Sequence, residues 1–525
     1  MKRFPYMIIK LVSMFACLAS GIFADNAEDI LKLHLDAMGG RENVAPIYSM
    51  KGYATVEYMG NPAKLKVFIK FPYQSLIQYD MGSASIIVAT DGIQGWTTDI
   101  NGAIRANSPE ELKPFYNDAY ISTYSYLFPN RNPGRTEYRG DTLINGANYH
   151  HFGLFPEGGD SIFIFINHKS GLIDYRLGFL SGLKMQTSYK DYRKVDGIMM
   201  AFESVSEAVG TPFQINSRLD SVFLNVEIPD TIFSNPSGND DIYGFGNDKN
   251  YAEVPFSLNR GHITIKTYVN GQGPFDFMLD SGAGSSLLSP GMVSALGLKP
   301  FGALPARGVG GLNSINIVEI DSINIENLTL NYNRIGIFNS ESKTEQLFKR
   351  IDGILGYDFI SRFPLKIDFD RGIITVYQED SAPKNPGGIP VNLEIQFQLP
   401  LINVEVNGII TRTAIDLGAQ VEYVLRENSK VYPGLKNKFD SLNLKSSITG
   451  IGGVERVKTA RLDSIKIDRL VFMNPKILLF ETGIAFPLPD YIEGLIGLEL
   501  LDDFNLFFDY NQRKIYFENR SEPKN

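Results

Sequence analysis

Two aspartates in the C-terminal half of the chain each end an apolar run and precede a glycine-containing turn. Asp280 lies in FMLDSGAGSSLL (277–288), and Asp416 lies in TAIDLGAQVEYVL (413–425). An apolar strand that ends in a carboxylate carries this group into a low-dielectric site, where burial raises its pKa. Glycine after the aspartate lets the backbone turn so that its N–H groups reach the carboxylate. A pair of such acids is suited to general acid–base chemistry on one water molecule.

The two aspartates belong to an internal repeat with four landmarks in the same order. The landmarks are the aspartate, a glycine-rich tetrapeptide, an apolar pair before glycine, and a hairpin of alternating apolar residues. After the aspartate, the first copy has GVGG at 308–311, ILG at 354–356 and LKIDFDRGIITVY at 365–377. The second copy has GIGG at 450–453, LIG at 495–497 and LFFDYNQRKIYF at 506–517. Four matched landmarks indicate a duplicated lobe, whereas Asp-Ser-Gly alone is also typical of surface turns.

Two stretches of turn-forming residues divide the chain. They are SNPSGNDDIYGFGNDKN (234–250) and QEDSAPKNPGGIP (378–390), and both have the composition of linkers. A chain of 525 residues is also too long for one compact core. We expect a signal peptide, an N-terminal β domain and two lobes, at 1–24, 25–235, 250–378 and 389–520.

The N-terminus has the composition of a targeting segment. Basic residues precede the uncharged run LVSMFACLASGIFA (11–24), which is too short to span a bilayer but fits a signal-peptide core. We expect cleavage after Ala24 and export to a bacterial periplasm or cell envelope. The alternative is a lipoprotein acylated at Cys17, the only cysteine, although Phe15 fits that motif poorly.

Charge and motif content exclude several other functions. The net charge of -9 at pH 7 gives no basis for a nucleic-acid partner. The chain contains no HExxH motif and no Gly-Lys pair for a phosphate-binding loop. Adjacent residues on a strand point to opposite faces, so His150 and His151 do not predict a metal site. His262 is expected to be an exposed structural residue, and we expect no metal and no cofactor.

The N-terminal domain is predicted to be a mostly antiparallel sheet. KLKVFIKF (64–71) places apolar residues on one face with a period of two. The phrases AMGGRENVAPIYSMKGYATVEY (37–58) and TDGIQGWTTDINGAIRANSPEELKPF (90–115) resemble the lipoprotein-carrier fold of the LolA/LolB type. This resemblance, over about 26–233, implies a curved half-barrel sheet whose concave face accepts a lipid or acyl chain. The alternative is an accessory domain with an ordinary packed sheet.

The repeated lobes resemble aspartic proteases, in particular the retropepsin-like branch. LDSGAGSSLL, a glycine-rich flap and ILG before a short helix carry the resemblance. It implies a mainly β protein with two tandem β-barrel lobes that form a bilobal acid protease, in which one acid acts as general base and the other donates a proton. The residues carried over are the dyad Asp280 and Asp416; the loop residues Ser281, Gly282, Ala283, Gly418 and Ala419; and the flap residues Gly308, Val309, Gly310, Gly311, Gly450, Ile451, Gly452 and Gly453.

Leu417 departs from the family pattern, which has Thr or Ser at this position. In the family this hydroxyl bonds across the axis to the partner loop, which leucine cannot do. One such bond contributes about 0.5–1.5 kcal/mol, which is too little to unfold the domain but enough to loosen the dyad.

Three functions stay open. The favoured one is a monomeric endopeptidase that cleaves a peptide or protein substrate with an intramolecular dyad. The second has a degenerate second lobe, so that the protein is a homodimeric protease or a non-catalytic peptide binder. The third is an envelope carrier or sensor for lipid or lipoprotein. Asp416 is retained in an apolar strand, and a buried acid is costly, which argues against a degenerate lobe.

Overall fold

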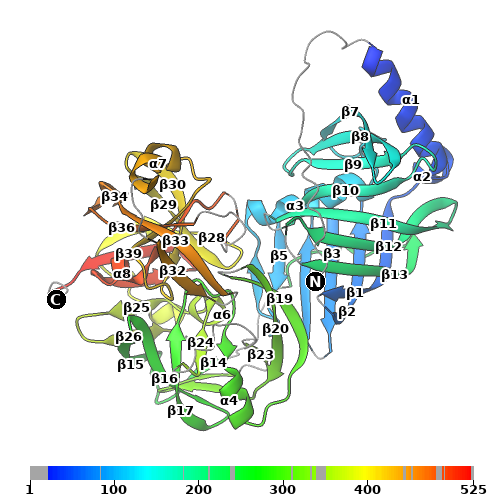
Figure 1. Ribbon diagram of the computed structural model, residues 1–525. Helices are drawn as coiled ribbons and strands as arrows, with labels where there is room; N and C mark the ends of the chain where they lie inside the picture. Colours follow the sequence, from blue (N-terminus) through cyan, green and yellow to red (C-terminus); the bar gives the residue numbers. More distant parts are fainter. Residues whose placement is uncertain are drawn as a thin grey trace, which may run out of the picture.

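The computed structural model describes most of the chain beyond its N-terminal segment (Figure 1). The described residues are 22–58, 60–82, 84–180, 183–210, 213–236, 243–308, 311–331, 334–337, 351–440, 445–450, 453–480, 488–489 and 491–521. Residues 1–21, with Cys17, therefore lie outside them, as do the flap residues Val309, Gly310, Ile451 and Gly452. The predicted fold class is confirmed, because the protein is mainly β and its N-terminal sheet is a curled half-barrel.

The N-terminal domain is a single antiparallel sheet. Its strand order is β6-β5-β4-β3-β2-β1-β13-β12-β11-β10-β9-β8-β7, so that the first and last strands of the domain meet in the middle of the sheet. The strands are β1 Ser49–Tyr58, β2 Asn61–Lys70, β3 Gln74–Met81, β4 Ala84–Thr90, β5 Gly95–Thr98, β6 Ile104–Ala106, β7 Gly134–Ile144, β8 Ala147–Pro156, β9 Ile162–Asn167, β10 Ile173–Leu180, β11 Leu183–Val195, β12 Ile198–Ala208 and β13 Gln214–Leu224.

Few helices accompany this sheet. They are α1 Ile22–Ala37, α2 Arg41–Val44, α3 Pro109–Ser122 and the 3₁₀ helix η1 Asp230–Ile232. α3 begins with a capping box, in which the Ser108 side chain accepts from the Glu111 backbone and the Glu111 carboxylate accepts from the Ser108 backbone. Tyr120 of α3 is buried against apolar residues of β8 and β9. Within the described part of the chain, no helix is long and apolar enough to cross a membrane.

The remaining strands form two lobes of similar plan. Lobe 1 contains β14 Tyr243–Phe245, β15 Tyr251–Asn259, β16 His262–Val269, β17 Gln272–Leu279, β18 Leu287–Leu288, β19 Phe301–Gly308, β20 Gly311–Glu319, β21 Ile323–Ile325, β22 Leu328–Leu330, β23 Arg334–Ile337, β24 Gly353–Leu355, β25 Leu365–Asp368 and β26 Ile373–Tyr377, with α4 Pro290–Ala295 and α6 Tyr357–Ile360. After η2 Glu379–Ser381, lobe 2 contains β27 Ile389–Asn392, β28 Glu394–Gln396, β29 Leu399–Val406, β30 Ile409–Asp416, β31 Tyr423–Arg426, β32 Lys445–Gly450, β33 Gly453–Arg461, β34 Ser464–Ile467, β35 Leu470–Met473, β36 Lys476–Phe480, β37 Gly494–Gly497, β38 Phe504–Asp509 and β39 Lys514–Asn519, with α7 Tyr432–Asp440 and α8 Leu498–Leu501.

The last hairpins of the two copies join the lobes edge to edge. β25 pairs antiparallel with β38, with Leu365 opposite Phe508. The strand order β15-β26-β25-β38-β39-β27 therefore runs without a break from lobe 1 into lobe 2. Buried apolar residues of both lobes belong to one continuous core. The lobes are thus held together by backbone hydrogen bonds and by shared apolar packing.

The first predicted linker is not entirely loop. β14, at 243–245, pairs with β22 and belongs to lobe 1. Its two aromatic side chains pack against Phe363, with ring centroids 4.8 Å from Tyr243 and 6.1 Å from Phe245. Alternating aromatic residues favour a strand, and this preference prevails over the loop-forming residues around them.

The N-terminal sheet packs on the first hairpin of lobe 1, formed by β19 and β20. β19 lies against β2 and β3. Leu304 of β19 contacts the apolar cluster of Val56, Ala63 and Met81, and it also packs on the buried Ile317. The N-terminal domain therefore supports one side of this hairpin with apolar contacts.

Candidate active site

Both candidate acids follow strands of the same topology. Asp280 follows β17, which pairs parallel with β24, and Asp416 ends β30, which pairs parallel with β37. The residues just before each acid, Leu279 and Ile415, are fully buried. The apolar run that precedes each aspartate therefore forms a core strand that brings the carboxyl group to the lobe boundary.

The structure brings Asp280 and Asp416 together across this boundary. A Cβ atom built on Gly282 would lie 2.6 Å from the carboxyl carbon of Asp416, and one on Gly418 would lie 2.4 Å from that of Asp280. The two carboxyl groups are close enough that each influences the pKa of the other. Each glycine is therefore needed because the opposite acid approaches its backbone, and any larger residue would collide with that acid.

The two acids differ in their electrostatic environment. Burial raises the pKa of Asp280, and burial together with the charge of Asp280 raises the pKa of Asp416 much further. The Asp280 carboxylate accepts backbone N–H bonds from Gly282 at 2.8 Å and Ala283 at 3.2 Å, and the Asp416 carboxyl accepts one from Gly418 at 2.9 Å. Because two adjacent carboxylates cannot both ionise cheaply, the pair holds one proton. With two backbone donors against one, Asp280 is the better-stabilised carboxylate, which favours the proton on Asp416.

One hydroxyl group connects the two acid-bearing loops. Ser281 is fully buried, and its Oγ donates to the Ile415 carbonyl at 2.9 Å and accepts from the Leu417 N–H at 3.0 Å. Leu417 has no hydroxyl to return this contact, and its side chain is fully buried in the shared core. Lobe 1 therefore supplies a hydroxyl that bonds across the lobe boundary, whereas the matched position of lobe 2 supplies only apolar packing.

The apolar-apolar-Gly motifs lie directly beneath the two loops. A Cβ atom on Gly356 would lie 2.7 Å from the Ala283 carbonyl oxygen, and one on Gly497 would lie 2.6 Å from that of Ala419. The next residue in each copy donates its backbone N–H to the same carbonyl, at 2.8 Å in both lobes. These glycines let the support strand approach the loop closely, as the sequence predicted.

A buried hydrogen-bond cluster that the sequence did not predict holds the loop of lobe 1. The Asp358 carboxylate accepts from the backbone N–H and the hydroxyl of Ser286, both at 2.7 Å. The Ser286 hydroxyl in turn accepts from the Gly356 N–H at 3.1 Å. Burial raises the pKa of Asp358 to about 6. This cluster links the loop of Asp280 to the start of α6.

Lobe 2 differs from lobe 1 at the matched positions of this cluster. Glu422 stands where lobe 1 has Ser286, and Glu499 stands where it has Asp358. Glu422 Oε2 accepts from the Lys476 N–H at 2.6 Å, on the neighbouring strand β36. Comparison of the two copies could therefore not have identified the cluster, because only one copy contains it.

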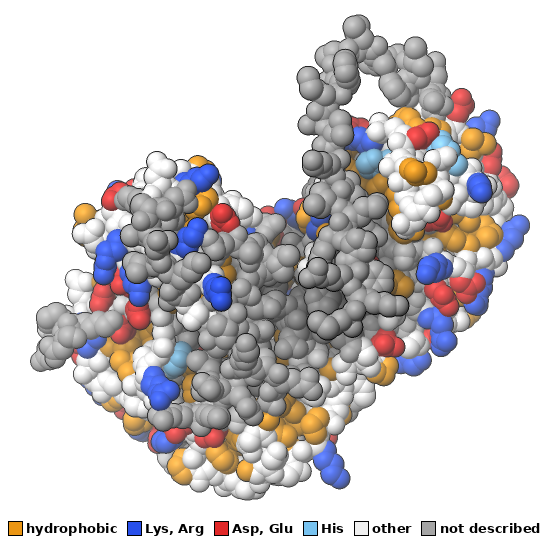
Figure 2. Space-filling model, in the orientation of Figure 1, with side chains coloured by type: hydrophobic (Ala, Val, Ile, Leu, Met, Phe, Trp, Pro, Cys, Tyr) orange, Lys and Arg blue, Asp and Glu red, His pale blue; other side chains and the backbone are white. Residues whose placement is uncertain are grey.

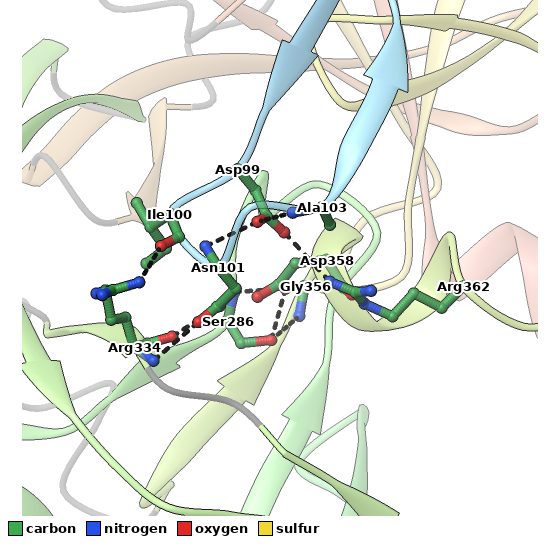
Figure 3. Close-up of polar contacts among 9 residues, drawn as sticks. All are labelled: Asp99, Ile100, Asn101, Ala103, Ser286, Arg334, Gly356, Asp358 and Arg362. Atoms are coloured by element: carbon green, nitrogen blue, oxygen red, sulfur yellow. Dashed lines mark hydrogen bonds and ion pairs between the residues drawn. The ribbon is translucent and has the colours of Figure 1, made fainter. Parts of the chain in front are cut away.

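The N-terminal domain contacts this support directly (Figure 3). Asp99, in the turn between β5 and β6, pairs with Arg362 at 3.3 Å, and both side chains are mostly buried. Arg362 Nε donates to the Asp358 carbonyl at 2.5 Å. Asn101 exchanges hydrogen bonds of 2.9 and 2.8 Å with the Arg334 backbone. The turn at 99–103 is therefore attached to α6 and β23, next to the loop of Asp280.

The flap residues lie where the repeat predicts hairpins. β19 pairs with β20 up to Gly308 opposite Gly311, and β32 pairs with β33 up to Gly450 opposite Gly453. The other four predicted flap residues lie outside the described residues.

His262 is buried, which contradicts its expected exposure. Only 8% of its surface is exposed, and a Cβ atom built on the preceding Gly261 would lie 2.9 Å from the Gln420 side chain. Position 262 starts β16 beside the second acid loop, a proximity across the lobe boundary that a local sequence pattern cannot show. Tyr423 and Leu288, which follow the acids, are fully buried core residues.

Comparison with known proteins supports part of these assignments. A family model described as aspartyl protease matches residues 265–359, which include Asp280 and the Gly356 motif of lobe 1. Comparison with curated proteins gave no significant match. The solved structures that resemble this chain include an aspartic proteinase from Irpex lacteus, at 12% identity over 52% of this chain and 98% of that chain, with a TM-score of 0.36. They also include a LolA superfamily protein from Nitrosomonas europaea, at 12% identity over 40% of this chain and 97% of that chain, with a TM-score of 0.30.

Proposed function

We propose that this protein is an exported aspartic endopeptidase whose dyad is Asp280 and Asp416. The observation that carries the proposal is the reciprocal contact of each carboxyl group with the glycine after the other, at 2.6 and 2.4 Å from the built Cβ atoms. Both acids come from one chain, and Ser281 ties their loops together. A monomer is therefore sufficient to form the dyad.

The proposed reaction uses the difference between the two acids. The ionised Asp280 takes a proton from a water molecule that lies between the carboxyl groups, and the oxygen of that water attacks the peptide carbonyl carbon. Asp416 donates its proton to the carbonyl oxygen, which gives a tetrahedral diol. The proton held by Asp280 then passes to the departing amine as the C–N bond breaks, while one diol hydroxyl returns its proton to Asp416 and becomes the carbonyl oxygen of the product. One water molecule is consumed, the dyad again holds one proton, and the products are a carboxylic acid and an amine.

Single substitutions of the two acids test this proposal. Asp280→Asn and Asp416→Asn keep the side-chain shape but prevent the dyad from sharing one proton, so each is expected to abolish cleavage of a peptide library. Asp276→Asn is the matched control, since Asp276 lies on the same strand β17 but pairs with Lys266 at 2.7 Å on the surface. We expect wild type and the Asp276→Asn control to cleave the peptide library over a range of pH. A statine-type inhibitor should inhibit both.

The alternatives give different results in the same experiment. If lobe 2 is degenerate and two copies of lobe 1 pair between chains, Asp416→Asn keeps full activity and specific activity falls on dilution. If the protein only binds peptides, no variant and no pH gives cleavage, but labelled peptides still bind. Either result would overturn the proposed intramolecular dyad.

Export is part of the proposal and rests on the N-terminal run LVSMFACLASGIFA. Cell fractionation of the producing bacterium checks it, together with N-terminal sequencing of the mature chain. Cleavage after Ala24 gives Asp25 as the first residue, whereas a lipoprotein starts at an acylated Cys17. Recovery of the intact chain in the cytoplasm would overturn the proposed export.

The N-terminal domain adds a second candidate activity, the binding of an acyl chain. The observation behind it is a cavity between α3 and the sheet, whose wall combines the apolar Ile162, Phe179, Leu180 and Met185 with the ion pair of Asp118 and Arg176. Two of these side chains, Phe179 and Leu180, are more than one third exposed. Displacement of a fluorescent fatty acid from the full chain tests this activity, with Leu180→Asp as the variant expected to lose binding.

A further inference from the structure

Three metal-ligating side chains converge at the far end of the N-terminal sheet. Asp141 of β7 lies directly opposite His150 of β8 in the antiparallel register. His168 follows β9, and its backbone N–H donates to the Asn148 carbonyl at 3.1 Å. Histidine side chains reach the molecular surface at this end of the domain, near β7, β8 and β9 (Figure 2). Three neighbouring segments of one sheet thus place an aspartate and two histidines together.

The donor atoms of these side chains face one another. His150 Nδ1 lies 2.7 Å from Asp141 Oδ1, and His168 Nε2 lies 3.3 Å from the same oxygen. The two imidazole rings stack with their centroids 3.8 Å apart. One ligand atom from each of the three residues lies within 4.8 Å of the others.

We propose that Asp141, His150 and His168 bind a divalent transition-metal ion, with Zn²⁺ as the reference ion. Two imidazole nitrogens and one carboxylate oxygen form a donor set that zinc accepts, and bonds of about 2.0–2.2 Å in a tetrahedron place donors roughly 3.3–3.6 Å apart. The observed separations, from 2.7 Å to at most 4.8 Å, bracket this spacing. The site is partly exposed, so that a water molecule or an external ligand can take the fourth position.

The surroundings of the carboxylate favour a metal ligand. The Tyr138 hydroxyl donates to Asp141 Oδ1 at 2.6 Å, which orients the carboxylate as the hydrogen-bonded neighbours of metal ligands do. The same oxygen also lies close to His150 Nδ1 and His168 Nε2. One oxygen cannot accept hydrogen bonds from the tyrosine hydroxyl and both imidazole rings with good geometry. A cation between the rings and the carboxylate replaces this crowded arrangement with three ligand bonds. The acid dyad lies in the other lobes and plays no part in this argument.

Metal titration of the full mature chain tests the proposal. After treatment with a chelator, the protein is titrated with Zn²⁺ by calorimetry and with Co²⁺ by visible absorption, which detects tetrahedral coordination. We expect one ion per chain, and at least a tenfold loss of affinity in His168→Ala and in Asp141→Asn. The Co²⁺ absorption should disappear in both variants. Both residues are at least partly exposed, and circular dichroism checks that each variant is folded.

The neighbouring histidine provides the matched control. His151 follows His150 on β8 but stacks on Phe165, with ring centroids 4.7 Å apart, so His151→Gln should keep wild-type affinity and the Co²⁺ spectrum. Equal Zn²⁺ affinity in wild type and His168→Ala would overturn the proposal, as would the lack of one-to-one binding in wild type. Protease activity is not used as a readout, so the result does not depend on the proposed dyad.

Discussion

Substitution of Ser281 by alanine tests whether one hydroxyl aligns the two acids. The change removes a donor to the Ile415 carbonyl at 2.9 Å and an acceptor for the Leu417 N–H at 3.0 Å. Ser281 is fully buried, so water does not replace these bonds in the unaltered fold. Each stranded buried group costs about 1–3 kcal/mol, and Ser281→Ala is therefore expected to lower the stability of the two lobes by at least about 2 kcal/mol.

The catalytic effect of this change should exceed that of an ordinary destabilised variant. Loss of the Ser281 hydrogen bonds lets the two acid-bearing loops shift independently. A displacement of a catalytic group by about 1 Å lowers the rate on the order of 10²-fold. We expect kcat on a peptide substrate to fall by about this factor at temperatures where the variant is fully folded. The pH profile of kcat should also change, because the shared proton depends on the distance between the carboxyl groups.

Two comparison variants make this test specific. Ser281→Thr keeps the hydroxyl and should stay close to wild type in kcat. Ser294→Ala removes an exposed hydroxyl of α4, which donates to the Pro290 carbonyl at 3.0 Å, and should change neither kcat nor stability. The reasoning is refuted if folded Ser281→Ala keeps wild-type kcat and pH profile.

Three further predictions concern pH and the contact between domains. The pH profile of kcat/KM should be bell-shaped, because activity falls in acid as Asp280 takes a proton and in alkali as Asp416 loses one. Since burial raises both pKa values, activity should persist above the pH range in which carboxyl groups usually titrate. A flat pH profile contradicts this prediction. Burial lowers the pKa of His34 to about 4, so the N-terminal domain should lose stability as pH falls from about 6.5 towards 4. Thermal unfolding at several pH values measures this loss. If His34→Gln loses as much stability in acid as wild type, the prediction is wrong. Arg362→Ala removes the ion pair with Asp99 and should lower kcat as well as thermal stability; unchanged kinetics would mean that the contact does not support the acid loop.

The repeat predicted the parts of the fold that both lobes contain. Apolar runs before Asp280 and Asp416 form buried strands, and both ILG-type motifs lie under the loops, because these features depend on local pattern and on close packing. The approach of Gly418 to Asp280 follows once two such lobes face each other. The predicted role of glycine was a backbone turn, whereas the structure adds a second requirement, which is space for the opposite acid.

Contacts between distant segments could not be predicted in this way. Ser286 and Asp358 meet at 2.7 Å, but lobe 2 has glutamates at the matched positions, so the repeat gave no signal. Asp99 reaches Arg362 from another domain, and no local periodicity encodes that docking. The sequence places His150 next to His151, but the sheet register pairs His150 with Asp141 instead. These side chains come together through register and domain docking.

The single hydroxyl between the acid loops is possible because both halves belong to one chain. In an assembly of two identical subunits, leucine at the position after the acid would appear twice, and both crossing hydroxyls would be lost together. Here Ser281 and Leu417 are encoded separately, so one half can give up its polar contact while the other keeps it. Separate encoding of the two lobes thus allows each to specialise, with Ser281 of lobe 1 supplying alignment and Leu417 of lobe 2 supplying apolar packing.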